Sequence, residues 1–473
     1  MANKVNGADL KKAGYKEGKI LGLALKTAED IKGISKKEKL ALLKKVRDYP
    51  EMFMDDQIVE PLARAIVDEA NAPRLEPISL KAPNQPYTVF GAGYIEEGAR
   101  EQMNVAMRLP VAVAGALMPD AHQGYGLPIG GVLATENVVI PYGVGVDIGC
   151  RMSLTIYDIK EKDFAKHETS FKRELIAHTK FGAGEGFKGS NRSDHEVLDS
   201  VDFGVAPFVA AMRDKAWSQL GTSGGGNHFV EWGIVEFEHD DETLNVPAGK
   251  YVGLLSHSGS RGFGATIAGH YTKLAKEICR LPKEAMNLAY LELDSDEGQQ
   301  YWIAMSLAGE YASACHQVIH NKLTRAINAA PLARVENHHN FAWKEQWRGK
   351  DVIVHRKGAT PAGKGTMGII PGSMTAPGFV VRGRGDESSI QSASHGAGRL
   401  MSRTKAVQTF TRDQLKKALH EKNVTLIGAG LDESPMAYKD INMVMNAQQD
   451  LVDIVARFQP RIVRMAADGS RED

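Results

Sequence analysis

The sequence predicts an α+β protein, in which a large mixed domain at residues 86–473 follows a small helical module at residues 1–80. Three observations support this fold class. From about residue 86, short apolar runs are typical of buried strands, and each run ends in a glycine-rich or polar loop. Helical segments interrupt these runs without strict alternation, which argues against a βαβ barrel. The first 80 residues show helical apolar spacing.

The expected elements can be placed in chain order. Residues 9–31, 37–46 and 58–69 carry apolar residues at helical spacing, with lysine-rich outer faces. Prolines mark the link that follows, at residues 71–77 and 82–86. In the large domain, we expect strands at residues 111–114, 138–140, 251–255, 352–354 and 378–381, and helices at residues 265–280, 298–327, 412–421 and 439–457.

The composition is ordinary for a globular protein and carries no bulk charge. Among the 473 residues, 58 are Lys or Arg and 58 are Asp or Glu, so the net charge is zero. A polyanion must therefore bind to a local basic patch. The three cysteines have no paired spacing, which indicates a reducing compartment. Because no signal peptide or membrane-spanning run is visible, we expect a cytoplasmic protein with no membrane partner.

Polar chemistry gathers in loops rich in small residues, where functional side chains are often found. Asp120 and His122 follow an apolar run, and a simple polar turn would explain them equally well. Asp147 and Cys150 are three residues apart, so a turn would bring the carboxylate and the thiol together. A buried free cysteine is the commonest alternative, and a mixed site for a borderline-soft metal ion is a fair competitor.

Histidines recur in these loops. Three glycines lie shortly before His228, while His257 follows an apolar strand and His339 precedes an asparagine. Each histidine alone fits a structural role, but together with the carboxylate and thiol above they provide enough ligands for one or two divalent cations. His316 and His320 have the spacing of helical zinc ligands but lack the glutamate of that motif, so we interpret them as ordinary helix residues.

A basic segment later in the chain suits phosphate groups. His355–Thr360 is followed by the turn Pro371–Met374 and by Arg382 and Arg384. Arginine forks and turn amides bind phosphate oxygens, although a solvated basic loop is a reasonable alternative for either arginine. The pattern is not a Walker loop, because no Gly-Lys-Ser/Thr lies between a strand and a helix.

His395 has almost no side-chain bulk around it. Its neighbours in Ser392–Arg399 are serine, alanine and glycine, which leave the backbone amides open and the imidazole accessible. A glycine-rich turn that happens to contain a histidine is the simple interpretation. The alternative is a ring that an anionic ligand approaches closely, and the basic residues Arg399, Arg403 and Lys405 favour it.

Together and in this order, the motifs resemble the RtcB family of RNA-splicing ligases. The resemblance runs from about residue 86 to the end of the chain and leaves out the first 80 residues. It implies a GTP- and Mn²⁺-dependent ligase that joins an RNA 3′-phosphate, or 2′,3′-cyclic phosphate, to a 5′-hydroxyl. The segments that carry the resemblance are Met118–Gly126, Val146–Cys150, Gly225–Glu231, His257–Gly262, His339–Asn340, His355–Thr360, Pro371–Met374 and Ser394–Arg399.

The resemblance also implies two manganese sites. Asp147, Cys150 and His228 resemble the ligands of one ion. Cys150, His257 and His339 resemble the ligands of the second ion, with the cysteine shared between the two. Divalent ions at these positions would neutralise a triphosphate and polarise its phosphoryl oxygens.

His395 matches the nucleophile of the family, which attacks the α-phosphate of GTP and becomes guanylylated. Asp120 matches an acidic residue that supports this histidine. The residues that resemble the nucleotide contacts of the family are Asn227, His228, Phe229, Val230, Glu231, His339, Asn340, Pro371, Gly372, Ser373, Met374, His395, Gly396, Ala397, Gly398 and Tyr438.

Charge and position alone make Arg261, Arg399 and Arg403 our candidates for contacts with RNA phosphates.

Two departures from the family concern the nucleotide. Gly378 stands where the family has a serine, and Met465 lies near the place of a lysine that contacts guanine. These departures leave the nucleotide selectivity open.

Two other classes of function use the same residues. The metal set would also serve a phosphoesterase that opens RNA cyclic phosphates without joining ends. A non-catalytic, RNA-binding member could use the N-terminal helices to recruit a protein partner. Only ligation requires an accessible His395, and the intact ligand positions count against a non-catalytic protein.

Overall fold

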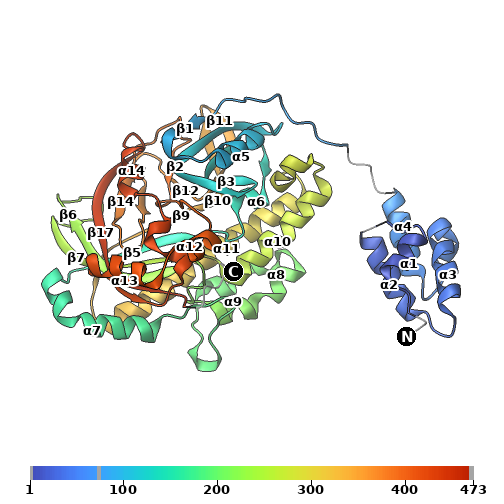
Figure 1. The fold of residues 1–473 in the computed structure, drawn as a ribbon, viewed down its shortest axis with the longest axis horizontal. Coiled ribbons are helices and arrows are strands. Elements are labelled where there is room, and N and C mark those ends of the chain that lie inside the picture. Colours follow the sequence, from blue (N-terminus) through green and yellow to red (C-terminus); the bar gives the residue numbers. More distant parts are fainter. Residues whose placement is uncertain (1–3, 17, 72–75, 468–473) are drawn as a thin grey trace. The chain divides into compact units, whose positions relative to one another are not determined.

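The computed structural model describes residues 4–16, 18–71 and 76–467, and the chain divides into two compact units, Met1–Glu76 and Pro77–Asp473 (Figure 1). Helices form the first unit, while helices and sheets together form the second. The predicted α+β class is therefore confirmed. In the described part of the chain, no helix is long and apolar enough to cross a membrane.

The first unit has its own hydrophobic core. Its helices are α1 (Gly7–Lys12), α2 (Lys19–Asp30), α3 (Lys36–Asp48) and α4 (Glu60–Asn71). Leu10, Leu43 and Leu62 are buried among them. The helical spacing seen at residues 9–31 is interrupted in the structure, because Gly14 has a φ of 93° that lies outside the helical region.

The second unit combines two large sheets with helices. Its helices are α5 (Glu97–Met107), α6 (Pro141–Val144), α7 (Glu161–His178), α8 (Pro207–Ala211), α9 (Arg213–Gln219), α10 (Arg261–Ile278), α11 (Asp296–Ile327), α12 (Arg403–Thr409), α13 (Arg412–Glu421) and α14 (Ile441–Asn446). Its strands are β1 (Thr88–Val89), β2 (Ala112–Tyr125), β3 (Leu127–Thr135), β4 (Val138–Val139), β5 (Arg151–Tyr157), β6 (Phe229–Phe237), β7 (Gly249–Ser258), β8 (Leu291–Glu292), β9 (Pro331–His338), β10 (Asn340–Trp347), β11 (Lys350–Lys357), β12 (Ala359–Pro361), β13 (Met367–Ile370), β14 (Gly378–Gly383), β15 (Ser392–Ser394), β16 (Thr425–Ile427) and β17 (Val452–Met465).

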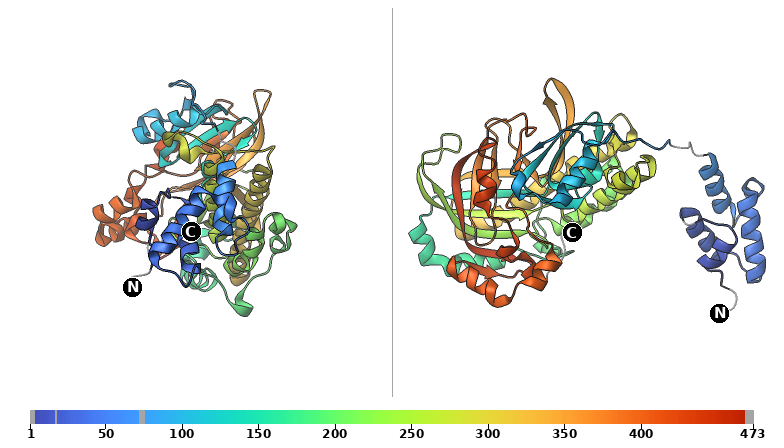
Figure 2. Two further views of the ribbon diagram at one scale, coloured as in Figure 1. Left: turned by 90° about the vertical axis from the view of Figure 1, so that its right-hand side faces the viewer. Right: turned by 45° about the horizontal axis from the view of Figure 1, so that its top comes forward.

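An eight-stranded sheet has the order β13-β14-β17-β6-β7-β5-β9, with β16 paired to β17, and a five-stranded sheet has the order β1-β2-β3-β11-β10. The chain passes from the first sheet to the second between β9 and β10. Helix α5 packs on β2 and β3, whereas the long helix α11 packs on β5 and β7 and alongside α10 (Figure 2).

The helix predicted at residues 439–457 is wrong in its second half. Only Ile441–Asn446 is helical, and the chain then enters β17 at Val452. This strand lies between β14 and β6, so pairing with distant strands decides its structure. Pro460 lies inside it, at a register shift against β6, where a residue without an N–H group is tolerated.

The first polar loop of the sequence is also reassigned. Residues 118–125 belong to β2, which runs on to Tyr125 and turns directly into β3. The pairing of β2 with β3 shifts register between Leu117 and His122. This irregularity lies around Asp120, and bulges of this kind redirect side chains beside functional sites.

Candidate active site

Strand register brings the candidate metal ligands together. Strand β5 lies between β7 and β9, and Met152 pairs with His257. Cys150 directly precedes β5, and its carbonyl accepts a hydrogen bond from the backbone N–H of His339 at 3.0 Å. His228 directly precedes β6, where Phe229 pairs with His257. Residues far apart in the sequence therefore meet at one end of the sheet.

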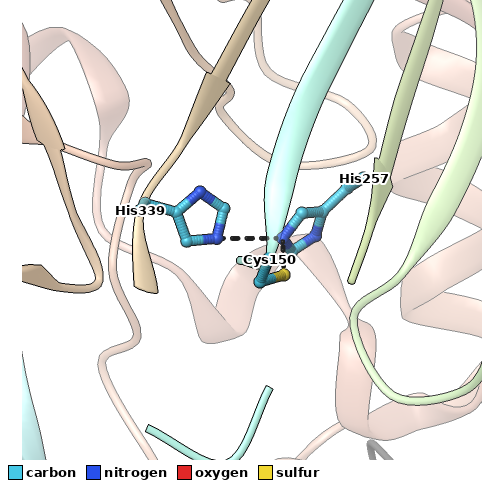
Figure 3. A group of neighbouring side chains, drawn as sticks. All are labelled: Cys150, His257 and His339. Carbon is cyan, nitrogen blue, oxygen red and sulfur yellow. Dashed lines mark hydrogen bonds between the residues drawn. The ribbon is translucent and has the colours of Figure 1, made fainter. Parts of the chain in front are cut away.

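Cys150, His257 and His339 converge on one point (Figure 3). The sulfur of Cys150 lies 3.2 Å from Nε2 of His257, and that nitrogen lies 3.3 Å from Nε2 of His339. Nδ1 of His257 lies 3.2 Å from the backbone carbonyl of Asn227. Because a carbonyl can only accept, Nδ1 carries the proton of the neutral ring and Nε2 keeps a free electron pair.

Cys150 also belongs to a second buried group. Nε2 of His228 lies 3.1 Å from Oδ2 of Asp147 and 3.5 Å from the sulfur of Cys150. The other carboxylate oxygen of Asp147 accepts a hydrogen bond from the backbone N–H of Ser260 at 3.0 Å. In each group the donor atoms lie within 4.8 Å of one another. Two neighbouring sites that share a thiol fit borderline-soft divalent ions.

The protonation states suit metal ligands. Burial holds the pKa of His257 and of His339 well below the ordinary value, so both rings are neutral at pH 7. Burial alone would raise the pKa of Asp147, but hydrogen bonding, above all to His228, lowers it to about 2. Neutral imidazoles and an ionised carboxylate are the forms that bind metal ions.

Unpaired polar atoms mark the same place. Among the described residues, several buried side-chain atoms have no hydrogen-bond partner, and four of them lie at this site: Asp120 Oδ1, Asn227 Oδ1, His339 Nδ1 and Ser394 Oγ. Buried polar groups are normally paired, so their concentration here indicates a polar ligand. The donor set fits divalent metal ions, and the unpaired atoms fit a polar ligand beside them.

His395 follows β15 and is held by Asp120. Its Nδ1 lies 2.7 Å from Oδ2 of Asp120, and its backbone N–H donates to the same oxygen at 3.1 Å. Burial opposes ionisation of the carboxyl, but the hydrogen bond to His395 and the charge of Lys439 hold the pKa of Asp120 below its ordinary value. An ionised carboxylate can only accept, so Nδ1 of His395 carries a proton and Nε2 of the neutral ring is free to attack.

An open cleft connects the donors Cys150, His257 and His339 with His395. Most of the predicted nucleotide contacts line it, namely Asn227, Phe229, Glu231, His339, Asn340, Pro371, Gly372, Ser373, Met374, His395, Gly396, Ala397, Gly398 and Tyr438. Val230 does not line the cleft, because side chains alternate along β6 and its side chain is buried on the opposite face. His228 does not line the cleft either, because it belongs to the buried group of Asp147 and Cys150.

Gly398 is required by the packing between β2 and the His395 loop. Its φ is 74°, and a Cβ atom there would lie 2.1 Å from the backbone oxygen of Asp120. At Gly396, by contrast, the nearest atom would be 3.4 Å away, at the backbone oxygen of Pro371. The small residues around His395 therefore have distinct roles, and Gly398 lets Asp120 approach the loop closely.

The three candidate RNA arginines occupy different environments. Arg399 and Arg403 line the cleft and pair with the buried carboxylates of Asp432 and Glu433. Arg261 is buried, with Nη1 3.5 Å from Nδ1 of His228. The structure therefore places Arg261 behind the metal donors and away from the cleft wall.

Sequence reasoning missed Glu433 and Lys439. Glu433 lines the cleft and accepts a hydrogen bond from the Tyr438 hydroxyl, and Lys439 donates to the backbone oxygens of Pro119 and Ala121 on either side of Asp120. Both residues lie in an unremarkable turn. Their roles arise from tertiary contacts, so no local signal in the sequence marks them.

The chain is similar to known proteins over most of its length. The family model described as tRNA-splicing ligase RtcB matches residues 102–466. The RNA-splicing ligase RtcB of Escherichia coli strain K12 is 33% identical over 408 residues, covering 80% of this chain and 96% of that protein. The tRNA-splicing ligase RtcB of Nanoarchaeum equitans is 31% identical over 458 residues, covering 80% and 94%. That of Thermococcus kodakarensis is 30% identical over 429 residues, covering 76% and 88%.

Fold, donor set and homology define an α+β enzyme of the ligase class. The chain belongs to the RtcB family. The predicted resemblance is therefore confirmed, and the prediction of an RNA ligase is confirmed at the level of the family.

Proposed function

We propose that this protein is a cytoplasmic, GTP- and Mn²⁺-dependent RNA ligase acting in RNA repair or tRNA splicing. Its substrates are RNA ends with a 3′-phosphate or 2′,3′-cyclic phosphate and ends with a 5′-hydroxyl. One observation carries the proposal: Asp120 holds Nδ1 of His395, which directs Nε2 into a cleft that Cys150, His257 and His339 also line. The helices before residue 77 are available to bind a partner protein.

The cleft supports a purine nucleotide. Phe229 and Met374 offer apolar surface, while Glu231 provides a carboxyl group on the same wall. Burial raises the pKa of Glu231 well above its ordinary value. A base that donates two hydrogen bonds, as guanine does, would favour the ionised carboxylate. Gly378 and Met465 also line the cleft, so both departures from the family face the nucleotide.

The donor residues fit two divalent ions. Asp147 and His228 would hold one ion, His257 and His339 would hold the other, and Cys150 would contact both. Bound there, such ions supply charge neutralisation for phosphate groups. The chain contributes neutral imidazoles and an ionised carboxylate, and it buries all of them away from bulk water.

In the proposed reaction, Nε2 of His395 attacks the α-phosphorus of GTP, a P–N bond forms, and pyrophosphate leaves. Asp120 retains the hydrogen bond to Nδ1 and stabilises the positive charge that develops on the ring. The RNA 3′-phosphate then takes the GMP group from His395, and the 5′-hydroxyl attacks that activated phosphate and expels GMP. A cyclic phosphate first requires hydrolysis to the 3′-phosphate.

The test is incubation of the protein with Mn²⁺ and α-labelled GTP. We expect an acid-labile label on the polypeptide that is absent from His395→Ala. Addition of RNA with a 3′-phosphate and a 5′-hydroxyl should release the label as GMP and yield joined RNA. If neither GTP nor ATP labels the protein, the covalent mechanism is wrong. If cyclic phosphates are opened without joining, the protein is a phosphoesterase.

A further inference from the structure

Tyr125 and Tyr142 form a pair of aromatic rings, the first exposed and the second half-buried, that the reaction above does not use. Tyr125 is 71% exposed at the end of β2, and Tyr142 lies in α6. Their ring centroids are 6.5 Å apart, with 35° between the planes. We propose that this tyrosine pair, with the groove beside it on α10, stacks the bases of single-stranded RNA next to the ligation junction. This proposal rests on the proposed function.

One buried lysine ties the backbones of the two tyrosines together. Nζ of Lys357 donates to the backbone oxygen of Tyr125 at 2.6 Å and to that of Tyr142 at 3.2 Å. The same ammonium lies 4.8 Å from the ring centroid of Tyr142. Because the backbones of the two tyrosines are held before a ligand arrives, less conformational entropy is lost when a base stacks on the rings.

The pair lies close to the reacting groups along two segments of chain. Helix α6 leads through Val146 into Asp147, the first metal donor. Lys357 is followed by Gly358, which lines the nucleotide cleft beside His395. An RNA strand stacked on the tyrosines would therefore have its end within reach of the metal donors and His395.

The groove beside Tyr142 suits a nucleic-acid strand. Its floor consists of Ala265, Ala268 and Gly269 on α10, which is in contact with α6 (Figure 1). Lys273 and Lys276 border the groove together with one acid, Glu277, which lies 4.0 Å from Lys273. The ammonium of Lys276 is 5.6 Å from the ring centroid of Tyr142.

This combination favours RNA over a protein partner. Aromatic rings bind bases without regard to sequence, and neighbouring cations track the phosphates. Small residues on the groove floor allow a backbone to lie close to the helix. Lys273 and Lys276 outnumber Glu277 at the groove, which gives it a small local excess of positive charge that a polyanion can use on a chain of zero net charge.

The test measures binding of the full-length protein to RNA that carries the fluorescent base 2-aminopurine near the junction. In one arm the probe is in the strand with the 3′-phosphate, and in the other arm it is in the strand with the 5′-hydroxyl. We expect fluorescence quenching in at least one arm. The double variant Tyr125→Ala/Tyr142→Ala should abolish that quenching and raise the Kd for RNA about tenfold. The double Phe variant should bind like the wild type, because the stacking surface remains.

Tyr94→Ala is the matched control, because Tyr94 is an exposed tyrosine outside the pair and the groove. Thermal unfolding followed by tryptophan fluorescence verifies that each variant is folded. Unchanged Kd and unchanged quenching in both arms for the double Ala variant would overturn the proposal. Labelling of His395 by GTP should remain at the wild-type level, so a failure of the proposed function appears as missing label and is distinct from missing stacking.

Discussion

At the scale of single residues, the Asp120–His395 pair decides which nitrogen can act. A ring with its proton on Nδ1 presents a free electron pair at Nε2, and the buried carboxylate enforces that tautomer. The backbone N–H groups of His395 and Gly396 donate to the same carboxylate oxygen, so the orientation of the ring is fixed as well.

Replacing Asp120 with asparagine should therefore slow labelling of His395 by GTP by roughly 100-fold to 10,000-fold, because an amide permits the wrong tautomer. The rate is measured by the incorporation of α-labelled GMP at saturating GTP. Asp241→Asn is the matched control, since Asp241 is also buried but pairs with Arg382. Equal rates for the two variants would show that Asp120 does not control the ring.

The shared sulfur of Cys150 leads to a prediction about stoichiometry. Wild-type protein should bind two Mn²⁺ ions, whereas Asp147→Asn and His339→Ala should each lose one. Cys150→Ala should lose both, because its sulfur belongs to both donor groups. Equilibrium dialysis with metal analysis measures the bound ions. Retention of one ion by Cys150→Ala would contradict the shared position.

At the scale of elements, the buried histidines of α11 brace strand β7. Nε2 of His316 donates to the backbone oxygen of Ser258 at 3.1 Å, so its Nδ1 accepts from the Ser256 hydroxyl at 2.6 Å. The same hydroxyl oxygen then accepts from Nε2 of His320 at 2.7 Å, and Nδ1 of His320 accepts from Thr155. Burial lowers the pKa of His316 to about 4, which keeps that ring neutral in this chain of hydrogen bonds.

Ser256→Ala should destabilise the large unit by roughly 3 kcal/mol, because it leaves buried nitrogens of His316 and His320 unpaired. Urea unfolding followed by tryptophan fluorescence reports this unit, since none of the 5 tryptophans precedes residue 77. Thr169→Ala, at an exposed position of α7, should change the free energy of unfolding by less than about 0.5 kcal/mol. A loss in Ser256→Ala no larger than in this control would show that the chain of hydrogen bonds adds no stability.

The sequence predicts those helices and strands whose structure depends on the pattern of neighbouring residues. The helix expected at residues 298–327 is α11, Asp296–Ile327, because a long periodic run has few alternatives. Strand β17 could not be predicted, because its apolar residues fit helical spacing equally well and pairing with β14 and β6 decides the outcome. Likewise, the donor histidines lie in recognisable motifs, whereas Lys439 contributes through contacts with distant backbone.

At the scale of the whole molecule, one of the two units contains the whole candidate site. The metal donors and His395 all lie in the unit Pro77–Asp473, and the unit Met1–Glu76 has a hydrophobic core of its own. A net charge of zero also means that attraction to RNA must come from local surfaces, such as the groove on α10 or the lysine-rich helices of the first unit.

Removal of residues 1–76 should therefore leave labelling of His395 within about twofold of the full-length rate, and the midpoint of tryptophan-monitored unfolding within about 2 °C, because the core of the larger unit is left intact. Leu43→Ala provides an independent check, since Leu43 is fully buried in the first unit and its truncation should cost that unit about 2–5 kcal/mol. It should reproduce the labelling rate of the deletion. A large loss of labelling in both variants would mean that the N-terminal helices take part in forming the active site. A loss of RNA joining with labelling intact would instead assign them to binding of the RNA or of a partner.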